Sequence, residues 1–281
     1  MNAIDVQNVT KAYADFTLEP ISLVLPMGTI MGLVGENGAG KSTLIKLIMN
    51  AIPSDGGAVS IWGVSNQAKE FVDLKQDIGI VLDEAYFPEA LSAKNINLIM
   101  QKTYLHWDTA LYTDYLKQFK LPLDKQFKEY SRGMKMKLAI AVALSHAPKL
   151  LILDEATGGL DPMVRDEILD VFNDFTRDES HSILMSSHIV SDLEKICDYI
   201  AFLHNGKLVL CEEKDALLNQ YALAKLSKAD FEALPKSAIV RKKATAYGYD
   251  ALLFKEQINP AFPTEKTTLE DIILFMTKEN Q

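Results

Sequence analysis

Hydrophobic positions along the chain are spaced in two ways, and their alternation predicts the fold class. Four short, nearly continuous apolar runs suit strands buried on both faces of a parallel sheet. They occupy residues 29–35, 77–83, 149–155 and 181–187. Stretches with helical spacing lie between these runs, at residues 41–50, 133–146 and 162–178. This alternation of strand and helix predicts an α/β fold with a mostly parallel, doubly wound sheet.

Other stretches predict additions to this core. Residues 3–13 and 16–26 are typical of strands in an antiparallel layer. Residues 92–128 have the pattern of consecutive helices, so we expect a helical subdomain inserted in the core at about residues 88–147. Residues 201–213 predict a hairpin that turns at Asn205 and Gly206, because this dipeptide is the strongest short-range signal for a tight turn.

The regular pattern loosens near Glu213, where we place a domain boundary. We expect one domain over residues 1–212 and a small mixed α/β accessory segment over residues 213–281. The segment ends in an amphipathic stretch. Its apolar stripe, which should pack on the core or on a second subunit, consists of Leu269, Ile272, Ile273 and Phe275.

Composition and charge narrow the function classes. The chain has 281 residues, 48% of them hydrophobic, and a net charge of -9 from 38 acidic and 29 basic side chains. This balance gives no support for a nucleic-acid partner. No apolar run approaches the roughly 20 residues that span a bilayer, so we expect a cytosolic protein or one attached to a membrane through a partner. Cys197 and Cys211 lack a metal-like spacing and indicate a reducing compartment.

A phosphate-binding loop is the first chemical motif. Residues from Gly35 to Ser42 follow a predicted strand, open a predicted helix and fit the pattern G-x-x-x-x-G-K-[ST]. Glycines allow successive backbone N–H groups to surround phosphates, Lys41 would reach the terminal phosphates, and the Ser42 hydroxyl would bind magnesium. A plain glycine turn would not require the Lys-Ser-Thr ending. The motif predicts nucleotide binding, but many NTPases share it.

Two carboxylates end another predicted strand. Asp154 and Glu155 follow four apolar residues at the carboxyl end of the strand over 149–155, where ligands of open α/β sheets bind. Asp154 would hold magnesium through its water shell, and Glu155 would polarise a water for attack on the terminal phosphate. The alternative is that both carboxylates cap the next turn.

Helix capping accounts for only part of the segment "YSRGM", residues 130–134. Ser131 is a good N-cap for the helix that follows, which Pro148 would end. Together with "GENGAGKST", "LLILDEATGGLDP" and "SSHIVSDLEKICDYI", in this order, the segment resembles the ATP-binding subunit of an ABC transporter over about residues 1–212. In that family the matching segment is the signature motif, whose serine, glycine and helix N-terminus face the γ-phosphate on a second subunit.

The resemblance implies a P-loop NTPase core and further site residues. Ser131 and Gly133 would complete the site of a partner subunit in a head-to-tail dimer with ATP and Mg²⁺. The phosphate loop would contribute Gly35, Asn37, Gly38, Ala39, Gly40, Lys41, Ser42 and Thr43. Tyr13 resembles the aromatic that stacks on adenine, although Phe16 is a nearby competitor and a surface or core tyrosine is the alternative.

Two more residues carry over from the family. Asp161 resembles the residue that links the two sites across the dimer, and an aspartate before Pro162 would also cap the next helix. His188, just after the strand over 181–187, resembles the switch histidine that contacts the γ-phosphate. A lone histidine is more often structural, but its order and spacing favour the functional interpretation.

The sequence departs from the family pattern in two places. Arg132 and Met134 stand where the signature usually has Gly and Gln. Asp83 stands where the family usually has a Gln that contacts magnesium and relays to the membrane subunit. Asp83 could still accept from magnesium-bound water, although it is shorter and charged. It could instead cap the turn before the helical insertion, with Glu84 as an equally exposed neighbour.

We therefore expect an ATPase subunit that drives export through a separate, membrane-embedded permease. It would bind the cytoplasmic face of the cell membrane through that permease, as one half of a homodimer or heterodimer. The tail, residues 267–276, resembles those of exporter subunits whose permeases have about six helices, and peptides or hydrophobic toxins and drugs are the expected substrates. The alternatives are a soluble ABC protein acting on ribosomes or DNA, and a non-hydrolysing binding module, which Glu155 argues against.

Overall fold

A six-stranded sheet forms the centre of the computed structural model, which describes residues 1–83, 87–260 and 262–277. Its strand order is β10-β9-β3-β8-β7-β6, with β10 antiparallel to β9 and the other neighbours parallel. The strands are β3 (Ile30–Val34), β6 (Ile78–Val81), β7 (Leu150–Asp154), β8 (Ser182–Ser187), β9 (Tyr199–His204) and β10 (Lys207–Glu213). All four predicted strands are present; β3, β7 and β8 are buried at every position, whereas Ile80 of the edge strand β6 is exposed, because no strand covers that edge among the described residues. The predicted hairpin is β9–β10, and Asn205 and Gly206 at its turn have positive φ.

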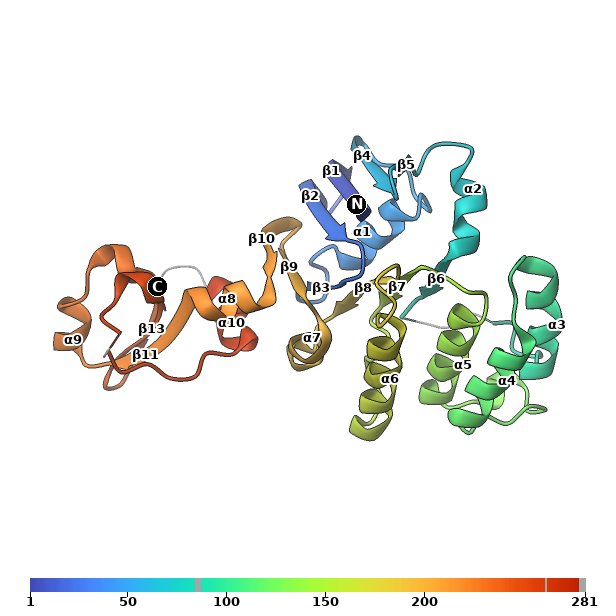
Figure 1. Cartoon of the computed structure of the whole chain (residues 1–281). Coiled ribbons are helices and arrows are strands. Elements are labelled where there is room, and N and C mark those ends of the chain that lie inside the picture. Colours follow the sequence, from blue (N-terminus) through green and yellow to red (C-terminus); the bar gives the residue numbers. More distant parts are fainter. Residues whose placement is uncertain (84–86, 261, 278–281) are drawn as a thin grey trace.

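A second, antiparallel sheet covers one face of the molecule (Figure 1). Its order is β2-β1-β4-β5, from β1 (Asn2–Ala12), β2 (Thr17–Pro26), β4 (Gly56–Ile61) and β5 (Val64–Ser65). The first two strands were predicted, whereas β4 and β5 were not. Helix α1 (Lys41–Ile48) shares one buried cluster with residues of both sheets, including Leu18, Leu44 and Ile152. The phosphate loop therefore starts a helix that is fixed between two sheets.

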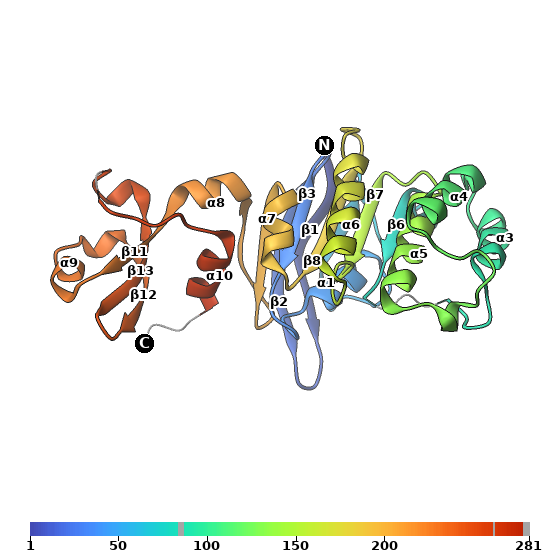
Figure 2. The ribbon, with the colours of Figure 1, turned by 90° about the horizontal axis from the view of Figure 1, so that it is seen from below.

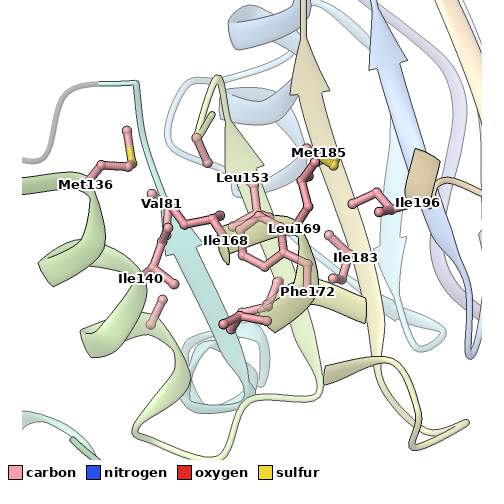
Figure 3. Packing of buried hydrophobic residues seen from close by; sticks show 14 of the residues in the cluster. Val81, Met136, Ile140, Leu153, Ile168, Leu169, Phe172, Ile183, Met185 and Ile196 are labelled. Carbon is pink, nitrogen blue, oxygen red and sulfur yellow. The ribbon is translucent and has the colours of Figure 1, made fainter. Parts of the chain in front are cut away.

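Three helices cover the opposite face of the six-stranded sheet. They are α5 (Arg132–Leu144), α6 (Pro162–Phe175) and α7 (Val190–Ile196). Figure 3 shows Ile140 of α5, Phe172 of α6 and Ile196 of α7 packed around Leu153 and Ile183 of the sheet. The predicted helices begin where caps were expected, since Ser131 Oγ accepts from Met134 N and Asp161 Oδ1 accepts from Val164 N. Both motif residues are therefore N-caps in this chain.

The predicted helical insertion lies at one end of the molecule (Figure 2). Helix α3 (Ala93–Thr103) packs on α4 (Thr109–Gln118), which packs on α5, while the short α2 (Phe71–Leu74) precedes β6. The chain enters this end from β6 and returns to the sheet through α5 and β7. The signature segment at the start of α5 thus joins the helical insertion to the core.

The accessory segment lies at the other end of the molecule (Figure 2). Its described residues contain a three-stranded sheet of order β11-β13-β12, three α-helices and two short 3-10 helices. Its elements are α8 (Lys214–Gln220), β11 (Tyr221–Leu226), α9 (Lys228–Glu232), β12 (Ile239–Thr245), β13 (Gly248–Phe254) and α10 (Leu269–Thr277). Helix α10 returns to α7, where Leu269 N donates to Glu194 Oε2 at 3.0 Å.

The apolar stripe of α10 packs on the core, as predicted. Leu269, Ile272 and Ile273 are buried in the same cluster as the helices of the six-stranded sheet, and Phe275 packs against it. The division at residue 213 stays a prediction, because the two parts share this cluster. None of the helices within the described ranges is long and apolar enough to cross a membrane.

Candidate active site

The phosphate loop connects β3 to α1 and is shaped by its glycines. Gly40 has φ 109°, and a Cβ there would lie 2.7 Å from Leu18 Cδ1, so only glycine fits. The Lys41 side chain folds back over the loop, with Nζ donating to Gly35 O at 2.8 Å and Glu36 O at 3.2 Å. Lys41 is only 5% exposed. The loop thus holds a buried cation at the N-terminus of a helix, which is a site for phosphates.

The hairpin between β9 and β10 supports the phosphate loop from the side. Gly206 N donates to Ala39 O at 3.2 Å, and Glu19 N of β2 donates to Gly206 O at 2.8 Å. His204 Nδ1 lies 2.9 Å from Glu36 Oε1 at the loop. Residues far apart in sequence therefore fix the loop between β2 and the sheet edge.

Asp154 and Glu155 lie at the carboxyl end of β7, beside the phosphate loop. Ser186 Oγ of β8 donates to Asp154 Oδ1 at 2.6 Å and accepts from Glu155 N at 3.0 Å. Glu155 has φ 52°, a left-handed conformation that is uncommon for a residue with a side chain. A strained backbone held by Ser186 is the kind of geometry that clusters at functional sites.

The Glu155 carboxylate joins two other predicted residues. Its Oε1 lies 3.2 Å from Lys41 Nζ, and its Oε2 lies 2.6 Å from His188 Nδ1. The Lys41 and Glu155 side chains are 6% and 11% exposed, so this ion pair is largely shielded from water. Lys41 begins α1 after the phosphate loop, whereas Glu155 and His188 directly follow the neighbouring strands β7 and β8. The arrangement brings a phosphate-binding cation, a carboxylate and a histidine together.

A cavity of about 560 Å³ opens at this sheet edge, a size within the usual range for ligand sites. It is lined by Tyr13, Asp15, Phe16, Asn37, Gly38, Gly40, Lys41, Ser42, Thr43, Asp83 and Glu155. Aromatic side chains thus lie near one part of the loop, and a carboxylate near the Lys41 ammonium. The cavity has the components that a nucleoside triphosphate needs.

Comparison with known proteins gives the family of this site. The family model described as "ABC transporter" matches residues 18–158. The chain belongs to the ABC transporter family. This membership confirms the predicted fold class and the prediction of an ATPase that binds ATP. As an ABC transporter ATPase, the chain works with membrane permease components and dimerises.

Several curated ABC transporter subunits resemble the chain over most of their length. The lantibiotic transport ATP-binding protein SrtF of Streptococcus pyogenes is 35% identical over 77% of this chain and 93% of its own. The bacitracin transport ATP-binding protein BcrA of Enterococcus faecalis is 35% identical over 73% of this chain and 68% of its own. The linearmycin resistance ATP-binding protein LnrL of Bacillus subtilis is 29% identical and covers 91% of this chain and 83% of its own.

Solved structures share the ABC transporter fold. An ATP-binding subunit of an ABC transporter is 28% identical with a TM-score of 0.70, covering 78% of this chain and 92% of that one. The dimeric cassette MJ0796, bound to ADP and Pi, is 22% identical with a TM-score of 0.67 and covers 75% of this chain and 98% of its own. The second likeness concerns the fold alone.

The two departures from the ABC transporter pattern contact each other. Arg132 Nη2 of the signature segment lies 3.2 Å from Asp83 Oδ1, at the end of β6. The same guanidinium lies beside Gly159, where an added Cβ would be 2.8 Å from Arg132 Nη1. Arg132 therefore links the signature segment, the loop after β6 and the segment before α6 within one subunit. Glu84, the alternative neighbour, lies outside the described residues.

Other signature and linking residues lie away from their own phosphate loop. Ser131, Gly133 and Asp161 do not line the cavity, and Ser131 and Asp161 are exposed caps of α5 and α6. Asp154 is buried and does not line the cavity. His188 does not line it either, but its ring contacts Glu155, which does. The structure therefore brings Tyr13, most of the loop, Asp83 and Glu155 together at one cavity, while Gly35 and Ala39 of the loop do not line it. Ser131, Gly133 and Asp161 lie outside this cavity, although Arg132 beside them contacts Asp83.

Ser186 and Asp15 were not predicted from the sequence. Ser186 holds both carboxylate residues, and the only signal was the pair of serines that ends β8 just before His188. Asp15 lines the cavity between Tyr13 and Phe16. Phe16, the competitor of Tyr13, also lines it, and the two ring centroids lie 6.5 Å apart.

Proposed function

We propose that this ABC transporter ATPase powers export of a peptide or hydrophobic toxin through a separate membrane-embedded permease. The observation that supports the chemistry best is the Lys41–Glu155–His188 cluster beside the phosphate loop. The export direction and substrate class are supported by relatives whose names state lantibiotic transport, bacitracin transport and linearmycin resistance. The subunit would act at the cytoplasmic face of the cell membrane, held there by its permease.

Nucleotide would enter the cavity with its phosphates in the loop and its base near Tyr13. The phosphates would attract the Lys41 ammonium, which lies 3.2 Å from Glu155 Oε1. Glu155 would then be free to accept a hydrogen bond from the attacking water. His188, held 2.6 Å from Glu155 Oε2, would be positioned beside the terminal phosphate.

Mg²⁺ fits the oxygen ligands at the cavity. Ser42 and Asp83 line it, and Asp154 lies at the end of β7 with a serine hydroxyl holding one carboxylate oxygen. Oxygen ligands from one or two carboxylates, a hydroxyl and phosphates are those that Mg²⁺ prefers. Among the described residues no group of three or more His, Cys, Asp and Glu side chains could hold a metal alone. Bound Mg²⁺ would neutralise charge on the phosphates.

A head-to-tail dimer would bring the signature residues into use. Ser131 and Gly133 start the 13-residue helix α5 and do not line the cavity of their own subunit. The N-terminus of a helix is a site for anions, so these residues suit the γ-phosphate on a second subunit. Asp161, the exposed N-cap of α6, would lie at the same interface.

The permease has an apolar surface available in the helical insertion. Leu98, Ile99 and Leu105 are exposed there, with Leu105 82% exposed. Exposed apolar side chains that gather on one region are typical of protein contacts. Leu105 N donates to Gln76 Oε1 at 3.0 Å just before β6, so a permease contact on this surface would act on the strand that leads to Asp83.

A mixed dimer tests the proposal. A Ser131→Arg subunit should bind ATP in its own loop but fail to close on a partner, and a Lys41→Ala subunit should bind phosphate weakly. In a mixed dimer one composite site carries both defects and the other carries neither, so partial hydrolysis should return. If mixed dimers are shown to form but hydrolysis does not return, the head-to-tail dimer with composite sites is contradicted.

The alternative class, an ABC protein acting on ribosomes or DNA, is tested by what the full chain binds in the cell. Co-purification with a multi-helix membrane protein supports the transporter subunit. Co-purification with ribosomes would overturn the export proposal while leaving the ATPase intact.

A further inference from the structure

The turn that carries Tyr13 is fastened to the start of β4 by one carboxylate. Asp55 Oδ1 accepts from Lys11 Nζ at 2.8 Å, and Asp55 Oδ2 accepts from Ala12 N at 2.7 Å. Asp55 N donates to Thr10 O at 3.0 Å. Three successive residues before Tyr13 are therefore bound to Asp55. The hydrogen bonds made by Lys11 and Ala12 lower the pKa of Asp55, so this carboxylate is ionised at neutral pH.

Lys11 also reaches the Tyr13 ring. Its Nζ lies 5.9 Å from the ring centroid, at the outer limit of a cation–π contact. The Lys11 side chain is only 14% exposed, so it fills space beside the ring. Tyr13 N donates to Phe16 O at 2.7 Å, which closes the turn. The Tyr13 side chain, 48% exposed, lines the nucleotide cavity.

A bulge in β1 sets this alignment. Gln7 pairs with Ala58 and Thr10 pairs with Gly56, so two residues of β1 lie opposite Gly57 alone. Gly57 has φ 79°, and a Cβ there would lie 2.3 Å from Asn8 O. The extra residue sets the following part of β1 back by one position relative to β4. Lys11 and Ala12 consequently lie next to Asp55 rather than beyond it.

We propose that Asp55 and Lys11 are positioning residues for the nucleobase, which hold Tyr13 at the cavity so that its ring can stack on adenine. The inference rests on the proposed function, in which ATP places its base at Tyr13. It deepens that function by separating two parts of the site. The phosphate loop binds the triphosphate, and the Asp55 contacts order the base platform in advance, which reduces the entropy lost on binding.

The test compares two ligands, ATP and inorganic tripolyphosphate, on the full chain. Tripolyphosphate has the phosphates but no base, so only a base platform distinguishes them. Asp55→Ala should raise the Kd for ATP about threefold to tenfold, part of what a lost base–aromatic stack costs, and leave the Kd for tripolyphosphate unchanged. Tyr13→Ala should do the same, and the double variant should bind ATP no more weakly than Tyr13→Ala alone.

Two further variants keep the test decisive. Lys11→Met keeps the aliphatic stem and removes the cation, so it should weaken the binding of ATP and leave the binding of tripolyphosphate unchanged. This variant keeps the inference testable if Asp55→Ala does not fold. Asp124→Ala is the matched control, because it breaks another Lys–Asp pair, an exposed one with Lys94 at 2.7 Å, in the helical insertion and away from the cavity. It should leave both ligands unaffected.

Each contrary result has its own meaning. Equal weakening of ATP and tripolyphosphate by Asp55→Ala and Lys11→Met would overturn the inference, since the contacts would then support the whole fold. Unchanged ATP binding by Tyr13→Ala would also overturn it and leave the ATPase standing. If the wild-type chain binds tripolyphosphate as tightly as ATP, no base platform contributes to binding and the inference is overturned. If it binds neither ligand, the proposed function itself is contradicted.

Discussion

The Lys41–Glu155 ion pair should oppose nucleotide binding, and Glu155→Gln measures by how much. Glu155 Oε1 lies 3.2 Å from Lys41 Nζ, and both side chains are about nine-tenths buried. The amide keeps the shape of the carboxylate but removes its charge, so Lys41 loses its anionic partner in the nucleotide-free protein. In the ATP-bound protein the phosphates would take that place. The substitution should therefore destabilise the free state more than the bound state.

The magnitude follows from the contacts that remain. Removing one partner of a buried pair costs about 3–5 kcal/mol when the other charge is stranded. Lys41 keeps its hydrogen bonds to Gly35 O and Glu36 O, so we expect about 2 kcal/mol, within the range for a buried polar group that loses a partner. For a chain of this size that lowers Tm by about 4–8 °C. The same 2 kcal/mol, recovered when ATP binds, tightens ATP binding by about 30-fold.

The assay measures thermal unfolding without nucleotide and ATP affinity by titration. Closure of a dimer would also tighten binding, so both measurements use the Ser131→Arg background, with mass measurements to confirm a monomer. Glu265→Gln is the matched control, because Glu265 is an exposed carboxylate that pairs with Lys225 at 2.9 Å and not with Lys41, and exposed pairs contribute little to stability. It should change neither quantity.

The result that refutes this reasoning is an unchanged Tm together with unchanged or weaker ATP affinity in Glu155→Gln. The pair would then contribute no energy to the nucleotide-free state. The catalytic role of Glu155 is tested separately, by steady-state phosphate release from Glu155→Gln in a chain that keeps its natural Ser131. Turnover within a few-fold of the unmodified chain would remove this residue from catalysis.

Three other predictions concern separate parts of the chain. Burial lowers the pKa of His146, which stacks on Tyr104. The free energy of unfolding should therefore be full above about pH 6.5 and decrease as the pH drops below it. His146→Phe should remove that decrease, as measured by urea denaturation at several pH values. Ile272→Ala, in the contact of α10 with α7, should cost about 2–5 kcal/mol of unfolding free energy without changing ATP affinity. Asp83→Asn should alter the magnesium requirement of hydrolysis and Asp83→Gln should restore much of it; if both keep the original requirement, Asp83 is a turn residue.

The phosphate loop and the buried strands could be predicted because their signals are local. Gly40 needs a left-handed backbone within its own motif, and β7 is apolar at every position before Asp154. β4 was missed because it is short, begins with two glycines and alternates weakly. Its formation depends on pairing with β1, about fifty residues earlier in the chain.

The contacts within the site could not be predicted, because they join residues that are distant in sequence. Asp83 meets Arg132 across 49 positions, and Asp55 meets Ala12 across 43. The sequence marked Asp83 and Arg132 as separate departures from a family pattern. Only the packing of the helical insertion against the end of β6 shows that one charge faces the other. The left-handed φ of Glu155 likewise depends on the hydrogen bonds of Ser186.

The β9–β10 hairpin gives the molecule a mechanical connection. Strand β10 ends at Glu213 and α8 begins at Lys214, with no slack residue between them. At its other end the same strand follows Gly206, whose backbone is bonded to both Ala39 and Glu19. Tension applied to the accessory segment would therefore travel along one extended strand to the wall of the phosphate loop. A partner that binds the accessory segment could therefore change the geometry of the nucleotide site without contacting it.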